Sequence, residues 1–214
     1  MIKPMLAYKV DKKPVDWSEK VFMQPKLDGV RCVISKDGAW SRTGKPWLNI
    51  DHILENLKPF FKQHPDIILD GELYNHELKN DFEKIISLVR KTKPEAGDRV
   101  ESAAYVQFHC YDYVDTKALF EERMNNLATS DMYSYCVKYV PTQQVKTREI
   151  ANAIHNNWLE SGYEGSILRL NGVYECKRSY NLQKFKDFHD TEATIVGYVP
   201  GKGKFTGLIG KFLM

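Results

Sequence analysis

The sequence has few cysteines and no long apolar run, and each absence excludes a class of protein. Its four cysteines are widely spaced and form no Cys-x-x-Cys pair, which argues against a zinc site or a disulfide framework. The N-terminus has no apolar stretch of signal-peptide length, and no run reaches the length of a membrane-spanning helix. We therefore expect a cytoplasmic protein with reduced thiols (Cys32, Cys110, Cys136 and Cys176) and no membrane association.

Neither positive nor negative charge is in large excess. The chain has 31 Lys and Arg against 28 Asp and Glu, a net charge of +3. Such a mild basic bias permits contact with nucleic acid without requiring it, so the position of the cations matters more than their number. With 214 residues, 43% of them hydrophobic, the chain can bury the core of one sizeable domain and part of a second.

The spacing of apolar residues predicts a mixed α+β fold. Helical segments alternate with hairpin-like pairs of strands, which favours α+β over a regular βαβ barrel. The charged segment 91–101 contains Pro94 and Gly97 and is typical of a surface loop. Strands are expected over 21–24, 30–34, 67–69, 105–113, 134–139, 165–170 and 194–199, and helices over 52–61, 81–89, 116–127 and 148–160.

The most informative stretch is Lys26-Leu27-Asp28-Gly29-Val30-Arg31. It joins two expected strands, so we expect a tight turn that presents Lys26 at the mouth of a sheet. A lysine can attack an electrophile once its ammonium loses a proton. A charged β-turn is the alternative, since Asp-Gly is a common hairpin dipeptide. Asp28 either orients the lysine or only initiates the turn, and Gly29 is expected to adopt a backbone conformation closed to other residues.

Five further segments follow: Ser41-Arg42-Thr43-Gly44-Lys45, Leu69-Asp70-Gly71-Glu72-Leu73-Tyr74, Phe108-His109-Cys110-Tyr111-Asp112-Tyr113, Glu164-Gly165-Ser166-Ile167-Leu168-Arg169 and Leu182-Gln183-Lys184-Phe185-Lys186. In this order and spacing they resemble the motifs of covalent nucleotidyltransferases, most closely the small ATP-dependent DNA ligases of phages and large DNA viruses. Lys3-Pro4-Met5-Leu6-Ala7 is similar to the ligase pattern just upstream of the adenylation domain. The resemblance implies a monomeric enzyme that uses ATP and Mg²⁺ (or Mn²⁺) to seal nicked duplex DNA.

The resemblance also implies roles around the nucleotide. Lys26 would be the nucleophile that forms a covalent bond with AMP. Gln24 would read the edge of the adenine. Tyr111 lies where the family has an aromatic residue that stacks on adenine, although its alternation with His109 and Tyr113 also fits a core residue.

Cationic side chains are expected to hold phosphates. The planar guanidinium suits bidentate contact with phosphate oxygens, and by resemblance Arg31 and Arg42 lie near the 5′-phosphate of the nick or the ribose of AMP. Arg178 occupies a similar family position; solvated arginines are the alternative. Lys184 and Lys186 share one face of a strand, where they would repel each other unless an anion such as the α-phosphate of ATP lies between them. A basic linker is the other interpretation.

Two glutamates next to glycines complete the expected site. Glu72 and Glu164 each follow or precede a glycine that lets the backbone approach a ligand closely. Their carboxylates would then bind a ribose hydroxyl or Mg²⁺, which prefers hard oxygen ligands.

A break near 187–190 divides the sequence. We expect a nucleotidyltransferase (adenylation) domain of antiparallel sheets flanked by helices over 1–188 and the start of an OB-fold over 189–214. An OB barrel needs five strands, and about two fit here, so we expect an incomplete domain. This form should self-adenylate poorly but retain phosphodiester formation on DNA that already carries the 5′-adenylate.

Three functions remain open at this point. A DNA ligase is favoured by Ser41-Arg42-Thr43, by Met5-Leu6-Ala7 and by the entry Glu192-Ala193-Thr194 to the second domain. RNA ligases and mRNA-capping guanylyltransferases share the covalent lysine and the motif order. A truncated module that binds nucleotide or nicked DNA without completing the cycle is the third.

Overall fold

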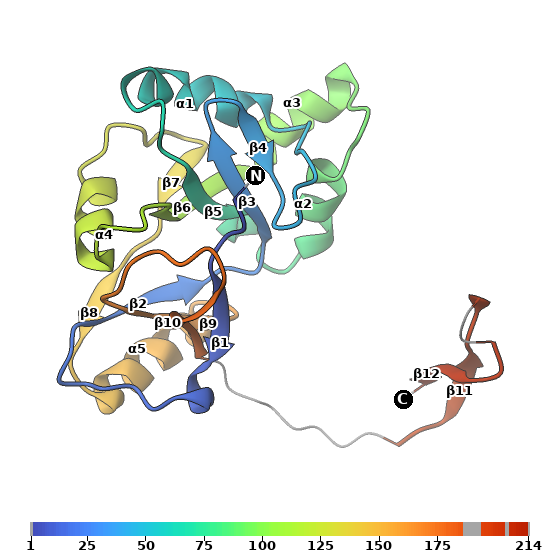
Figure 1. Cartoon of the computed structure of the whole chain (residues 1–214). Helices are drawn as coiled ribbons and strands as arrows, with labels where there is room; N and C mark the ends of the chain where they lie inside the picture. Colours follow the sequence, from blue (N-terminus) through green and yellow to red (C-terminus); the bar gives the residue numbers. More distant parts are fainter. Residues whose placement is uncertain (1, 186–193, 204–205, 214) are drawn as a thin grey trace.

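The computed structural model describes residues 2–185, 194–203 and 206–213. It contains two five-stranded sheets and a separate two-stranded hairpin, with five α-helices packed on the sheets (Figure 1). The α+β fold class predicted from the sequence is therefore confirmed. We call the two large sheets sheet A and sheet B.

Sheet A contains the first and last strands of residues 2–185, which we call the larger body. Its strand order is β1-β10-β9-β2-β8. β1 pairs with β10 in parallel and the other pairs are antiparallel. Helix α5 packs on this sheet, where Ala151 and Trp158 contact Val21, Met23 and Leu168. The elements are β1 (Leu6–Lys9), β2 (Val21–Lys26), β8 (Gln143–Val145), α5 (Arg148–Glu160), β9 (Gly165–Leu170) and β10 (Arg178–Phe185), with the short helix η1 (Val10–Lys12) after β1.

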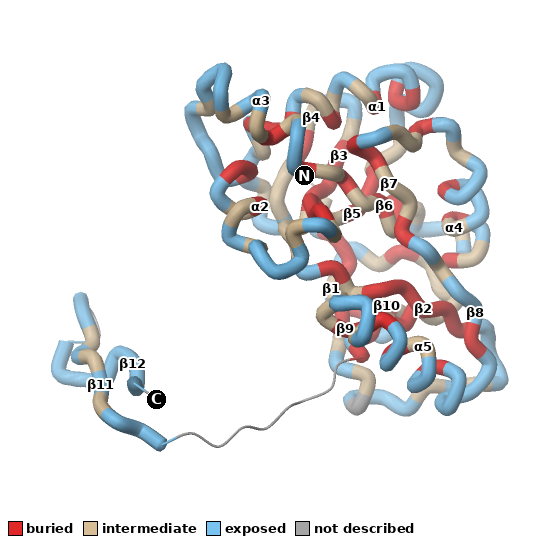
Figure 2. The backbone as a smooth tube through the Cα atoms, turned by 180° about the vertical axis from the view of Figure 1, so that it is seen from behind, coloured by how far each residue is buried: buried red, intermediate tan, exposed pale blue. Residues whose placement is uncertain are grey.

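Sheet B carries the larger core. Its order is β4-β3-β5-β6-β7, antiparallel except for the pair β6–β7. Apolar side chains of β3, β5 and β6 are buried beneath helices α1 and α2, and the buried positions in Figure 2 lie along these strands while the outer helix faces are exposed. The elements are β3 (Val30–Ser35), β4 (Gly38–Trp40), α1 (Asp51–Gln63), β5 (Leu69–Tyr74), η2 (His76–Leu78), α2 (Phe82–Val89), α3 (Ala96–Tyr105), β6 (Gln107–Tyr113), α4 (Phe120–Ala128) and β7 (Val137–Tyr139).

The connection between β2 and β3 differs from the prediction. It is short, but the two strands belong to different sheets, so Leu27-Asp28-Gly29 is a crossing between sheets and not a hairpin turn. Gly29 also does not adopt a positive φ. It is required for close packing instead, because a Cβ there would lie 2.5 Å from the carbonyl oxygen of Leu73 and 2.7 Å from Cγ of Glu72.

Two local predictions were wrong for identifiable reasons. The loop expected over 91–101 contains the start of α3, and Asp98 Oδ2 accepts a hydrogen bond from the backbone N–H of Glu95 at 3.0 Å, which caps the helix start. The strand expected over 67–69 runs instead as β5 from Leu69 to Tyr74. Gly71 permits this because a Cβ would lie 2.5 Å from the carbonyl oxygen of His109 on β6.

The C-terminal residues form the two strands that the sequence predicted, β11 (Gly197–Pro200) and β12 (Ile209–Leu213), paired antiparallel. The predicted domain boundary at 188/189 falls outside the described residues and stays a prediction. Across the part of the chain that the structure describes, no helix is both long and apolar enough to cross a membrane.

Candidate active site

A cavity of about 860 Å³ lies where the facing edges of the two sheets meet. Its walls come from β2, β9 and β10 of sheet A, from β3, β5 and β6 of sheet B, and from the loops after β4 and α2. Of the ten site residues predicted from the sequence, eight line this cavity, and a ninth, Glu164, contacts one of the eight. The eight are Gln24, Lys26, Arg31, Arg42, Glu72, Tyr111, Arg178 and Lys184; Lys186 lies outside the described residues.

Lys26 ends strand β2 and is placed by pairing with β9. It lies opposite Gly165 in the register, and its carbonyl accepts a hydrogen bond from the backbone N–H of Glu164 at 3.2 Å. Its Nζ forms an ion pair with Oε2 of Glu164. The side chains of the pair are only 15% and 27% exposed, so Glu164 holds the end of the lysine at the cavity and its carboxylate is placed to receive a proton from Nζ.

Arg31 is held by a buried carboxylate that sequence reasoning did not single out. Its Nε and Nη2 donate to the two carboxylate oxygens of Asp70 at 2.8 and 2.5 Å. Asp70 is fully buried and also accepts from the hydroxyl of Tyr174 at 2.7 Å. Burial opposes the charge on Arg31, but the attraction of Asp70 outweighs it and raises the pKa of Arg31 above its usual value. The guanidinium therefore reaches the cavity as a fixed cation.

Glu72 faces the cavity from β5, directly across from Arg31 in the register. Burial raises the pKa of Glu72 to about 8, against the opposing effect of Arg31, and the nearby Asp70 adds to the rise. Burial also raises the pKa of Tyr111, so its hydroxyl stays protonated and donates to Oε2 of Glu72 at 3.4 Å. Glu72 is thus a carboxyl group that carries a proton at neutral pH unless a cation bound in the cavity displaces it.

Gln24, Tyr111 and Arg169 form one contact group at the junction of the sheets. The amide of Gln24 donates to the carbonyl of Tyr111 at 3.1 Å and to Thr142 at 2.9 Å, and its oxygen accepts from Nε of Arg169 at 2.9 Å. The guanidinium groups of Arg31 and Arg169 lie 5.5 and 5.3 Å from the ring centre of Tyr111. The adenine roles of Gln24 and Tyr111 stay predictions, and the contacts show that both residues also join sheet A to sheet B.

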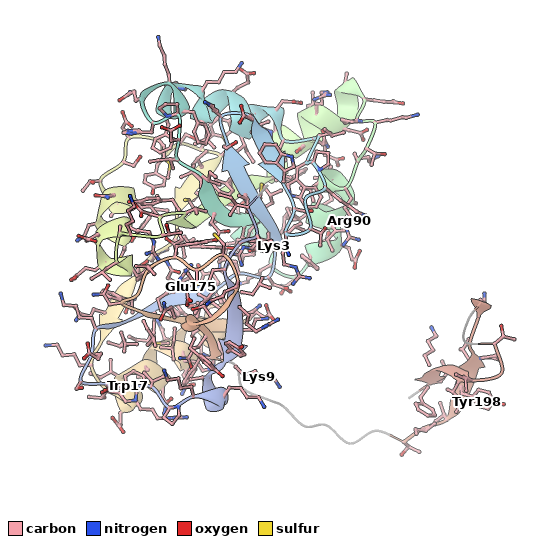
Figure 3. All side chains as sticks on the ribbon, in the orientation of Figure 1. Lys3, Lys9, Trp17, Arg90, Glu175 and Tyr198 are labelled. Atoms are coloured by element: carbon pink, nitrogen blue, oxygen red, sulfur yellow. The ribbon has the colours of Figure 1, made fainter. Side chains whose placement is uncertain are left out.

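A rim of cations surrounds the cavity. Arg42 is exposed at the tip of a turn in which Gly44, at φ +84°, lets Ser41 and Lys45 hydrogen bond across it. Arg90, labelled in Figure 3, directly follows α2 and also lines the cavity, and sequence reasoning had not selected it. From sheet A, Arg178 donates from Nη1 to the carbonyl of Ala7 at 2.5 Å. Lys45, Lys91 and Lys184 complete this rim.

Beneath the cavity lies a buried network that the sequence did not reveal. Asp112 accepts from Nε of Arg123 and from Nη1 of Arg169, both at 2.8 Å. The side chains of Asp112, Arg123 and Arg169 are 0%, 1% and 3% exposed. Asp112 and Arg169 lie within two of the sequence motifs, but only their long-range pairing distinguishes them from ordinary strand residues.

A divalent metal ion is compatible with this donor set only with help from a ligand. Glu72 and Glu164 offer hard oxygen atoms, yet among the described residues no group of three His, Cys, Asp or Glu side chains is placed to hold an ion. Mg²⁺ is commonly bound by one or two carboxylates together with water and phosphate oxygens. Glu72, which lines the cavity, and Glu164, which contacts the cavity-lining Lys26, are carboxylates of that kind beside the space for a nucleotide.

Comparison with known proteins identifies a family for most of the chain. The sequence profile of the ATP dependent DNA ligase domain matches residues 4–186. A DNA ligase of African swine fever virus is 30% identical over 228 residues, covering 98% of this chain and 52% of the viral protein. A DNA ligase of Enterobacteria phage T6 is 26% identical over 246 residues, covering 92% and 50%. The chain therefore spans about half the length of these curated relatives.

Solved structures share the fold. A Lig E DNA ligase superposes with a TM-score of 0.78 at 24% identity, covering 100% of this chain and 79% of that one. A DNA ligase-adenylate of Chlorella virus gives a TM-score of 0.66 at 22% identity, covering 99% and 77%. These similarities confirm the predicted nucleotidyltransferase fold.

Proposed function

The chain belongs to the ATP-dependent DNA ligase family, and on that premise we propose that it transfers AMP from ATP through Lys26 to the 5′-phosphate at a nick in duplex DNA and then seals the nick. The observation that carries the proposal is the position of Lys26. It ends a strand at a cavity large enough for a nucleotide, paired with Glu164 and surrounded by arginines and lysines.

Each step exchanges one bond at phosphorus. In the first, Nζ of Lys26 gives up a proton to Glu164 and bonds to the α-phosphorus of ATP, while the bond to pyrophosphate breaks and pyrophosphate leaves with the electron pair. In the second, an oxygen of the 5′-phosphate bonds to the adenylyl phosphorus while the bond to Nζ of Lys26 breaks and Nζ takes up a proton. In the third, the 3′-hydroxyl gives up its proton to solvent and bonds to the 5′-phosphorus, and AMP leaves with the electron pair. Catalysis of this kind depends on positioning and on neutralising phosphate charge.

Mg²⁺ or Mn²⁺, held by Glu72 and Glu164 together with phosphate oxygens, would supply charge neutralisation at the transferred phosphorus. The fixed guanidinium of Arg31 and the exposed Arg42 and Arg178 bind phosphate oxygens around it. Lys184 supplies a further ammonium from β10.

The names of the relatives support DNA ligation over the alternatives of an RNA ligase, a capping guanylyltransferase or a binding module without activity. The cytoplasmic location and monomeric state expected from the sequence stay predictions.

The test is AMP transfer followed by sealing. We expect AMP to appear on the chain at low yield on incubation with ATP and Mg²⁺, seen by intact-mass spectrometry, and GTP to give no adduct. Nicked DNA that already carries the 5′-adenylate should be sealed at higher yield in a gel assay than nicked DNA supplied with ATP, which tests the predicted poor self-adenylation. A GMP adduct in preference to AMP would favour the capping alternative.

Lys26→Ala should abolish the adduct without unfolding the protein, because its side chain lies at the cavity and not in a hydrophobic core. Lys36→Ala is the matched control, since Lys36 is an exposed lysine in the turn between β3 and β4. An adduct of normal yield in the Lys26→Ala variant would show that another residue is the nucleophile.

A further inference from the structure

Cations and tyrosines alternate along the edge of sheet A where β1 pairs with β10. The rings of Tyr8 and Tyr180 are stacked, with their centres 4.1 Å apart and 10° between their planes. The guanidinium of Arg178 lies 5.6 Å from the ring centre of Tyr8, and Nζ of Lys13 lies 5.6 Å from that of Tyr180. We call Arg178, Tyr8, Tyr180 and Lys13 the cation–tyrosine strip.

The strip continues outward from the cavity. Arg178 belongs to both, since it lines the cavity and also contacts the ring of Tyr8. β1 is an edge strand of sheet A, so no further strand among the described residues pairs with it on this side. Arg178, Tyr180 and Lys13 are exposed. A ligand strand that leaves the cavity on this side would therefore meet the strip next.

The charge of the strip fits a polyanion. Glu175, labelled in Figure 3, precedes β10 in the chain; it accepts from the hydroxyl of Ser179 and pairs with Lys177 at 3.0 Å. It is thus occupied by partners outside the strip. Phosphates held by Lys and Arg are the main source of affinity between proteins and DNA.

The arrangement of the tyrosines suits binding of a sugar–phosphate backbone better than stacking on unpaired bases. The two rings contact each other, and each has a cation beside it, so neither offers a free face of the kind on which single-stranded bases stack. Their role is to hold the cations in place, because a tyrosine loses little conformational entropy and a cation beside a ring is restrained. A hydrogen bond from Nη1 of Arg178 to the carbonyl oxygen of Ala7 restrains the guanidinium further.

We propose that the cation–tyrosine strip binds the sugar–phosphate backbone of the duplex beside the nick. The inference rests on the proposed function, which supplies the nicked duplex, and extends it to a surface outside the cavity. Binding of this kind sets how the duplex is oriented when its 5′-phosphate enters the cavity.

The test is the salt dependence of binding of the full chain to a nicked duplex, measured by fluorescence anisotropy without ATP. Lys13→Gln should reduce the slope of log K against log salt by about 0.9, the value for one phosphate contact. Tyr180→Leu should weaken binding about 2- to 5-fold at fixed salt, as loss of an exposed cation–ring contact implies.

Matched controls remove the same groups elsewhere. Lys62→Gln takes one positive charge from the exposed side of α1, and Tyr135→Leu replaces a tyrosine that is 61% exposed before β7. Neither should change the slope or the affinity to the same extent. Equal slopes for Lys13→Gln, Lys62→Gln and the unmodified chain would overturn the proposal, as would a loss on Tyr180→Leu that is larger for single-stranded DNA than for duplex.

The test of the cation–tyrosine strip and the test of the proposed function can fail independently. AMP transfer to the unmodified chain, measured without DNA, tests Lys26 alone. If the unmodified chain forms no AMP adduct but Lys13→Gln still reduces the salt slope, the strip is supported and the proposed function is not. If the adduct forms but Lys13→Gln leaves the slope unchanged, the proposed function is supported and the strip is not.

Discussion

Glu72 is a carboxyl group whose protonation couples the cavity to pH. It is partly buried on β5, hydrogen bonded by Tyr111 and close to Asp70. Burial raises its pKa to about 8, so the folded protein binds a proton there that the unfolded chain releases near pH 4.5. The stability that this neutral carboxyl group contributes is therefore fully present below about pH 4.5 and is lost as the pH rises through about 8.

This gives a prediction for Glu72→Gln, which keeps the shape and cannot ionise. The free energy of unfolding of the unmodified protein should decrease, relative to the variant, as pH rises from about 4.5 to about 8. The measurement is urea unfolding of both proteins at several pH values between 4 and 9. The variant should be relatively more stable at pH 9 than at pH 5.

Glu83→Gln is the control, because Glu83 is an exposed glutamate on α2. Its effect on the free energy of unfolding should change little over the same range. If the Glu72→Gln and Glu83→Gln differences follow the same curve, the environment assigned to Glu72 is wrong.

At the scale of elements, the crossing from β2 to β3 determines how Lys26, the proposed nucleophile, faces the second sheet. The crossing is three residues long and brings Lys26 on sheet A and Glu72 on sheet B to the walls of one cavity. The chain can follow this path only because Gly29 has no side chain; a Cβ there would lie 2.5 Å from the carbonyl oxygen of Leu73 on β5.

Gly29→Ala should therefore destabilise the protein by about 1–3 kcal/mol, the usual cost of overpacking. It should also slow AMP transfer, since the clash displaces β5 and with it Glu72. Chemical denaturation and adduct formation measure the two effects. Gly97→Ala is the matched control: Gly97 lies in helix α3, where an added Cβ would have no atom within 4 Å, so alanine should be neutral or stabilise by up to about 1 kcal/mol.

The elements show how far local sequence signals reach. The helix over 148–160 matches α5, Arg148–Glu160, because Thr147 caps it and its apolar spacing is regular. Helix α3 was missed because Pro94 and Gly97 suggest a loop, while the capping contact of Glu95 with Asp98 was overlooked. Local patterns predict that an element exists, but they contain no information about which strand pairs with which.

The same limit applies to the site. The motif order placed Lys26, Glu72 and Tyr111 at one cavity because it carries family information, which spacing alone does not provide. Asp70 and Asp112 lie within motifs but were assigned no role from the sequence. Their importance comes from contacts across 39 and 57 positions of sequence, with Arg31 and Arg169, and no local pattern marks them.

At the scale of the whole larger body, the two sheets are joined by buried polar contacts next to the cavity. Asp112 on β6 of sheet B binds Arg169 on β9 of sheet A and Arg123 on α4. Gln24 on β2 extends the connection through Arg169. A buried carboxylate between two guanidinium groups holds both sheets at one distance, and so fixes the width of the cavity whose walls they form.

Asp112→Asn keeps the shape of the side chain and removes its charge, leaving two buried guanidinium groups without their carboxylate. Loss of one partner from a buried ion pair typically costs about 3–5 kcal/mol, and we expect a decrease of that size in the free energy of unfolding. Glu55→Gln is the control, because Glu55 and Lys58 form an exposed pair on α1 whose loss should cost less than about 1 kcal/mol.

The variant also separates stability from geometry. Below its unfolding temperature, Asp112→Asn should form the AMP adduct more slowly than the unmodified chain, because Arg169 and Gln24 line the cavity and lose their fixed positions. Hydrogen exchange should show faster opening of β9 and β6 together, since one carboxylate supports both strands. Normal adduct formation, with faster exchange confined to α4, would mean that Asp112 serves only to anchor that helix and that the sheets are held together by their other contacts.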